Sequence, residues 1–129
     1  MPRSRKPPAA GETVSFATVV ELARAFPGVE EGTAYRTPAL RVRGKFLARL
    51  REDGETLVLR IGFDERDILI ASDPGVFFLT DHYRGYPAVL VRLAAIGRAE
   101  LREILAVAWA QNAPRRLVDE WRRQPRPEP

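Results

Sequence analysis

The feature that most constrains the fold of this 129-residue chain is a two-residue alternation between Leu40 and Arg51. Arginines hold most of the positions between the apolar ones, which are Leu40, Val42, Phe46, Ala48 and Leu50. Successive side chains of a strand point to opposite faces, so this period predicts strands with one apolar and one basic face. Gly44-Lys45 interrupts the run and indicates a tight turn between two strands.

The rest of the chain supplies further strands, three helices and a candidate for a last short helix at 115–123. Asp53-Gly54 predicts a second hairpin turn, and 29–33 (VEEGT) is expected to be a loop. We expect strands at 56–61, 76–79 and 88–93, and helices at about 16–26, 64–72 and 98–112. The expected order is helix, three strands, helix, two strands, helix. It predicts an α+β fold of two layers, with a mostly antiparallel sheet and helices on one face.

Charge and proline divide the chain into one domain and two ends. The net charge is +4, but the 13 bases and 13 acids from Thr13 to Ala113 cancel. Residues 1–13 are rich in proline and charge and are predicted to be a disordered basic tail. We expect the domain to span 14–117 and a second basic tail to occupy 118–129.

Composition excludes several classes of protein. The chain has no cysteine and a single histidine, His82, which excludes disulfide frameworks, thiolate zinc sites and metal sites built on several imidazoles. No apolar run is long enough to span a membrane, and no apolar segment follows the basic N-terminus as in a secretory signal. We therefore expect a cytoplasmic protein without cofactor or metal. Common catalytic motifs such as GxSxG and HExxH are missing, so we do not expect an enzyme.

A basic stretch is the first candidate site. Six bases and no acid lie between Ala34 and Arg51: Arg36, Arg41, Arg43, Lys45, Arg49 and Arg51. If they share one face of the sheet, they form an electropositive surface able to lie along the phosphates of DNA. The alternative is a solvated sheet face in which arginines pair with acids such as Glu52 and Glu55.

The segment 81–87 is the second candidate. It gathers the only histidine and two of the three tyrosines, and its candidate ligand-binding residues are His82, Tyr83, Arg84 and Tyr86. Aromatic rings and hydrogen-bonding groups in one loop suit a base or a small ligand. The alternative is a structural turn. Catalysis by His82 would need a positioned partner, and the sequence offers only the adjacent Asp81.

Five segments together resemble the MmcQ/YjbR family of small bacterial proteins. They are 25–35 (AFPGVEEGTAY), 38–50 (PALRVRGKFLARL), 73–78 (DPGVFF), 82–93 (HYRGYPAVLVRL) and 112–117 (NAPRRL). The resemblance implies a two-layer fold like that of secretion chaperones, in the element order expected above. The family is commonly labelled DNA-binding, on the basis of a proposed double-wing surface. The leading expectation is therefore sequence-nonspecific DNA binding. The alternative is a protein- or small-ligand-binding module that uses the His82–Tyr86 loop without catalysis.

Overall fold

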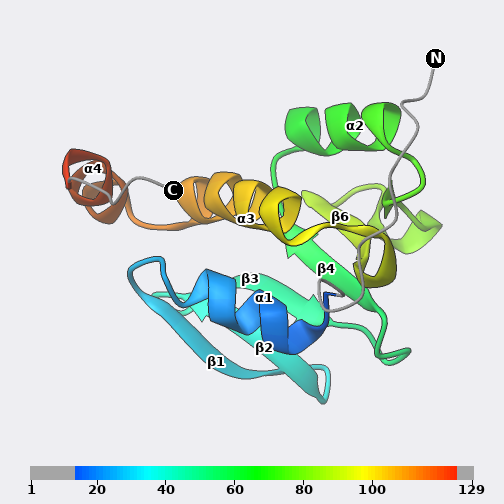
Figure 1. The fold of residues 1–129 in the computed structure, drawn as a ribbon, viewed down its shortest axis with the longest axis horizontal. Coiled ribbons are helices and arrows are strands. Elements are labelled where there is room, and N and C mark those ends of the chain that lie inside the picture. The colour runs from blue at the N-terminus through cyan, green and yellow to red at the C-terminus, as the bar shows by residue number, and fades with distance from the viewer. Residues whose placement is uncertain (1–13, 125–129) are drawn as a thin grey trace.

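The computed structural model describes residues 14–124 and has a six-stranded antiparallel sheet in the order β1-β2-β3-β4-β6-β5. The strands are β1 (Val29–Ala34), β2 (Thr37–Val42), β3 (Lys45–Leu50), β4 (Thr56–Arg60), β5 (Phe77–Phe78) and β6 (Ala88–Arg92). The α-helices are α1 (Phe16–Ala23), α2 (Phe63–Ser72), α3 (Arg98–Asn112) and α4 (Arg115–Arg123), with short 3-10 helices η1 (Asp81–Tyr83) and η2 (Leu93–Ala95). Figure 1 shows the order of these elements along the chain.

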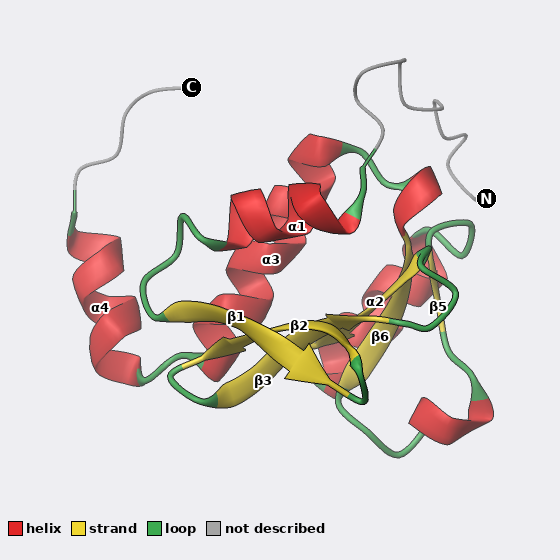
Figure 2. Cartoon of the chain, turned by 90° about the horizontal axis from the view of Figure 1, so that it is seen from below, coloured by secondary structure: helices red, strands yellow, loops and turns green. Residues whose placement is uncertain are grey.

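The fold has a layer of helices on one face of the sheet, so the two faces of the sheet differ. Helices α1 and α3 cover one face of the sheet, whereas η1 lies beyond the opposite face, at the lower right of Figure 2. We call this opposite face the open face. The expected α+β class, the antiparallel sheet and the helical layer are confirmed.

Strand β1 occupies the segment that we expected to be a loop, and that expectation was wrong. Its residues pair antiparallel with β2, from Val29 opposite Val42 to Ala34 opposite Thr37. The hairpin turn between the strands consists of Tyr35 and Arg36, whose φ angles are 55° and 66°. Two positive φ values are the pattern of a type I′ turn, which usually contains glycine or asparagine. Because neither residue is glycine or asparagine, the sequence contains no recognisable signal for this turn.

A β-bulge in β3 breaks the strict alternation on which the strand prediction rested. Leu40 pairs with Ala48, but Arg41 pairs with Phe46, so Leu47 is an extra residue opposite β2. Leu47 and Ala48 both join the core under the helices. Phe46, which we expected on the helical face, instead packs with Val58 on the open face.

The next hairpin is the predicted one at Asp53-Gly54. The Asp53 carboxylate accepts hydrogen bonds from the backbone N–H groups of Glu55 and Thr56, both at 2.9 Å. These bonds, that of Glu55 above all, hold the pKa of Asp53 below its usual value. The Asp53 side chain thus fixes the turn that joins β3 to β4.

Each face of the sheet carries an apolar cluster. The main core lies between the sheet and the helices, with Trp109 of α3 fully buried and its indole N–H donating to the Pro27 carbonyl at 2.8 Å. The smaller cluster is on the open face and consists of Val58, Ala88 and Leu90, with Phe46, Phe78 and Tyr83 packed against it. The open face is therefore partly apolar, not uniformly basic.

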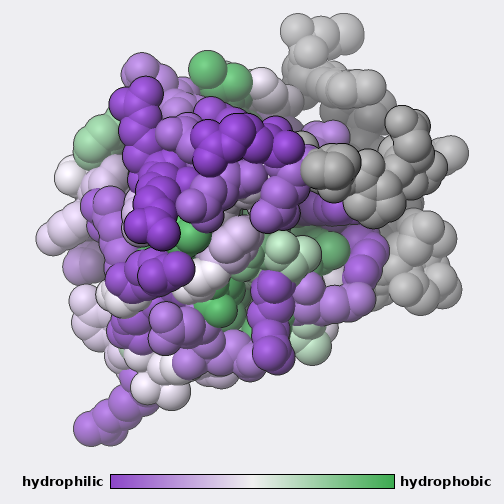
Figure 3. Space-filling view, turned by 90° about the vertical axis from the view of Figure 1, so that its left-hand side faces the viewer, coloured by the Kyte–Doolittle hydropathy of each residue, from purple (hydrophilic) through white to green (hydrophobic). Residues whose placement is uncertain are grey.

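Helix α4 corrects the expected boundary at residue 118. Val118 is only 5% exposed, and the Trp121 ring lies 5.3 Å from the rings of both Phe26 and Trp109. Residues 118–123 therefore belong to the folded domain. The outer side of α4 carries exposed arginines, and hydrophilic residues dominate this side of the molecule in Figure 3. The tails expected at 1–13 and beyond Gln124 lie outside the described residues.

Within residues 14–124, no helix is both long and apolar enough to cross a membrane.

Candidate ligand-binding groove

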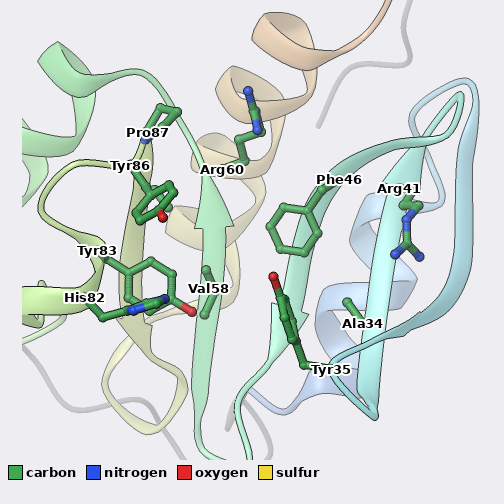
Figure 4. Close-up of a pocket in the computed structure, with 11 residues that line it drawn as sticks. Ala34, Tyr35, Arg41, Phe46, Val58, Arg60, His82, Tyr83, Tyr86 and Pro87 are labelled. Carbon is green, nitrogen blue, oxygen red and sulfur yellow. The ribbon is translucent and has the colours of Figure 1, made fainter.

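A groove of about 520 Å³ lies on the open face, between the β1–β2 turn and the segment that precedes β6. Figure 4 shows its two sides facing each other across β4. It is lined by Ala34, Tyr35, Arg41, Phe46, Val58, Arg60, His82, Tyr83, Tyr86, Pro87 and Ala88. We refer to it as the aromatic groove.

Aromatic rings form both walls of the aromatic groove. Tyr35 and Phe46 stand on one side, and His82, Tyr83 and Tyr86 stand on the other (Figure 4). The His82 ring meets the Tyr83 ring edge to face at 4.8 Å and stacks on the Tyr86 ring at 5.8 Å. The three residues that the sequence analysis grouped as a candidate site thus lie together on one side of the aromatic groove. Tyr35 and Phe46 were not predicted as site residues.

Arg66 of α2 holds the second wall in place. Arg66 is 8% exposed, and its Nη1 donates to the carbonyls of Arg84 and Tyr86 at 3.0 and 3.1 Å. These carbonyls flank Gly85 in the segment that carries the aromatic wall. One guanidinium thereby joins helix α2 to the segment that carries the aromatic wall. This role could not be predicted from the sequence, because it depends on residues 18 and 20 positions away.

Arg49 anchors the same wall from below, which corrects its prediction as an exposed DNA contact. It is only 7% exposed. Its Nη2 donates to the Tyr83 hydroxyl at 3.0 Å, its Nη1 pairs with Glu52 at 3.2 Å, and its guanidinium lies 5.0 Å from the centre of the Tyr35 ring. Burial alone would lower the pKa of Arg49, but Tyr83 and Glu52 outweigh burial and raise it. Arg49 therefore joins β3 to both walls.

Two other arginines line the aromatic groove. Arg41 is half-buried and donates to the Thr33 carbonyl at 3.0 Å, and Glu30 is its neighbour across the β1–β2 ladder. Arg60 is also half-buried, and its guanidinium makes no ion pair or hydrogen bond with residues 14–124. Among the described lining residues there is no carboxylate. A planar anion would thus find ring faces and two guanidinium groups in the lining itself.

The remaining predicted bases do not form one face. Arg36 lies in the β1–β2 turn, whereas Arg43 and Lys45 lie at the β2–β3 turn. Six residues of β2 separate these turns, which is roughly 20 Å of strand. Arg51 is half-buried just after β3. The uniform basic sheet face that we expected is therefore absent from the described part of the chain.

Arg84 is the one predicted loop residue that does not line the aromatic groove. It is exposed and pairs with Asp81 at 2.9 Å. In the region that the structure describes, no three His, Asp or Glu side chains gather closely enough to hold a metal ion. The site is therefore built from rings and guanidinium groups.

Comparison with known proteins gives the chain a family. The sequence model of the YjbR family matches residues 24–111. The chain is also 56% identical, over 50 residues, to the uncharacterized proteins Rv2570 and MT2646 of Mycobacterium tuberculosis and Mb2600 of Mycobacterium bovis. That match spans 39% of this chain and 39% of each relative's length. The family match includes β1, the aromatic groove and most of α3, so the chain belongs to the YjbR family.

Proposed function

We propose that this domain is a binding module for a small ligand that combines a planar ring with an anionic group. The observation that carries the proposal is the make-up of the aromatic groove. Ring walls from two distant segments face each other over the apolar floor of Val58 and Ala88, and Arg41 and Arg60 are the charged lining residues.

Each part of the aromatic groove has a physical counterpart in such a ligand. Its volume of about 520 Å³ lies within the range of roughly 300–1,000 Å³ that is usual for small-molecule sites. An aromatic pair adds about 0.5–1.5 kcal/mol beyond the burial of its area, so rings on two sides favour a flat ligand. A guanidinium binds carboxylate or phosphate with two parallel hydrogen bonds, which favours an anionic ligand.

The exposure of the wall residues also supports binding. Tyr35 is 81% exposed and Tyr86 is 56% exposed, although both rings are large and partly apolar. Tyr35 moreover has a positive φ, a conformation that costs free energy for a residue other than glycine. Residues held in strained backbone conformations cluster at active sites and ligand clamps.

A fluorescence titration of the full chain with 1-anilinonaphthalene-8-sulfonate, a planar aromatic anion, tests the proposal. We expect saturable binding at one site, weakened at least fivefold by Tyr35→Ala and by Tyr86→Ala. Both residues are exposed, so neither change should unfold the domain. Val107→Ala is the matched control, because Val107 is 43% exposed on α3, in the other layer. Equal affinities in all four proteins would reject the aromatic groove as a binding site.

Electrostatic DNA binding is the second candidate, now with a different surface. Exposed bases gather at the end of the molecule where the β2–β3 turn meets α4: Arg43, Lys45, Arg115, Arg122 and Arg123. The β2–β3 turn and α4 come close together at Gly28, because a Cβ built on Gly28 would lie 3.1 Å from Arg43 and 3.2 Å from Leu117. We call these five bases the basic end. It supports the DNA-binding proposal better than the sheet face does.

A further inference from the structure

A smaller hollow of about 200 Å³ adjoins the aromatic groove at the N-terminal end of α2. Its lining residues are Lys45, Arg60, Ile61, Gly62, Pro87, Gln111 and Asn112. Arg60 and Pro87 line both spaces. The two spaces therefore border each other at Arg60 and Pro87, and we call the smaller one the basic hollow.

Two cations, Lys45 and Arg60, line the basic hollow. The Lys45 ammonium and the Arg60 guanidinium make no ion pair or side-chain hydrogen bond with any described residue. Most other arginines of the sheet do have such a partner, as Arg41 has the Thr33 carbonyl and Arg49 has Glu52. Two like charges beside one small space repel each other, and an anion between them would relieve the repulsion.

Amide side chains of α3 hold the basic hollow in shape. Gln111 Oε1 accepts the Gly62 backbone N–H at 2.7 Å, and Asn112 Nδ2 donates to the Arg60 carbonyl at 3.1 Å. The Glu65 carboxylate lies beside this hollow, since a Cβ built on Gly62 would be 3.3 Å from it, and it accepts a hydrogen bond from the Gln111 amide. Of the described lining residues none is acidic. The strand end that carries Arg60 is thus fixed to the helical layer.

We infer that the ligand is a phosphate monoester of a ring-bearing molecule, with its phosphate in the basic hollow between Lys45 and Arg60. The inference rests on the proposed function, because the ring must occupy the aromatic groove. A space of about 200 Å³ beside an ammonium and a guanidinium suits a compact, doubly charged group better than a second ring. A nucleoside monophosphate has this chemistry.

Isothermal titration of the full chain with adenosine 5′-monophosphate and with adenosine, at one ionic strength, tests the inference. We expect the monophosphate to bind at least tenfold more tightly than adenosine. Lys45→Met should remove most of that difference and leave the affinity for adenosine unchanged, and Lys45→Glu should weaken the monophosphate further. Arg102→Met is the matched control, because it removes one exposed base from α3, away from both spaces.

The outcomes separate this inference from the function on which it rests. Equal affinities for adenosine 5′-monophosphate and adenosine would overturn the phosphate site. An unchanged affinity difference between these two ligands in Lys45→Met would overturn it as well. Loss of the gain in Arg102→Met as well would attribute it to net charge and would also overturn it. If neither adenosine 5′-monophosphate nor adenosine binds while anilinonaphthalene sulfonate does, the ligand is not a nucleotide and only this inference fails. If the sulfonate does not bind either, both proposals fail.

Discussion

At the scale of single residues, the structure gives Arg49 a different role from the one that its position in the sequence predicts. In the sequence it is one of six bases on an alternating strand, and this pattern predicts solvent on its side of the sheet. In the structure the 81–87 segment folds back over that side, and the Tyr83 hydroxyl accepts a hydrogen bond from Arg49. The charge is used to hold the aromatic wall, so it is unavailable to a nucleic acid.

The Arg49–Tyr83 contact should be measurable by a double-mutant cycle. We expect Tyr83→Phe to lower the free energy of unfolding by about 1 kcal/mol, the usual net value of one hydrogen bond. Arg49→Met should lower it by about 2 kcal/mol, because a buried charged donor has several partners. Urea denaturation of the two single variants and the double variant gives the coupling, expected at about 1 kcal/mol. A coupling near zero would show that the two side chains do not support each other.

At the scale of elements, strongly amphipathic segments were predicted well and irregular ones were not. Helix α3 spans the predicted 98–112, because its apolar stripe of Leu101, Ile104, Leu105 and Ala108 has helical spacing. Strand β1 was missed because four of its six residues are exposed and show no alternation. The bulge at Leu47 was missed because an extra residue leaves no mark in a pattern of apolar and basic positions.

Helix α4 supplies the prediction that belongs to this scale. We expect Trp121→Ala to lower the free energy of unfolding by about 2 kcal/mol, somewhat less than for a fully buried tryptophan, because Trp121 is half-buried against Phe26 and Trp109. Removal of residues 118–129 should cost more, since it also deletes the buried Val118. If 118–129 were a tail outside the domain, as expected from the sequence, the deletion would be harmless. Thermal and urea unfolding decide between them.

Arg122→Ala is the control for the α4 variants, because Arg122 lies on the exposed side of the same helix. A change within about 0.5 kcal/mol is expected for it, as for most surface substitutions. If Trp121→Ala were equally mild, α4 would not be a stabilising part of the domain.

At the scale of the whole molecule, the candidate site comes from the way the layers close. The sequence identified His82, Tyr83 and Tyr86 as a group, since they are close in the chain. It could not identify the opposite wall, because Tyr35 reaches the aromatic groove through a glycine-free type I′ turn and Phe46 through the bulge. Nor could it show that Arg60 borders two spaces at once. Position along a chain does not record which segments face each other across a sheet.

At the same scale, the distribution of charge over the molecule predicts how it would bind DNA. Any binding of a random-sequence duplex of about 20 base pairs should be electrostatic, with a log–log salt slope of magnitude about 0.9 for each phosphate contacted. We expect the basic end to carry it, so reversing two exposed arginines of α4 with Arg115→Glu and Arg122→Glu should weaken binding at least tenfold. Fluorescence anisotropy of the full chain at two salt concentrations measures this.

Two control proteins decide where that affinity comes from. Reversing Arg102 on α3 changes the net charge without touching the basic end, so it should weaken binding much less than the α4 pair does. Arg41→Gln removes a cation of the open face and should leave DNA binding unchanged while it weakens the aromatic sulfonate. If Arg41→Gln instead abolished DNA binding and the α4 pair did not, the sheet face would be the DNA surface after all. If no variant bound differently from the native chain, neither the α4 arginines nor Arg41 would contribute to DNA binding, and the basic end would lose its support as the DNA surface.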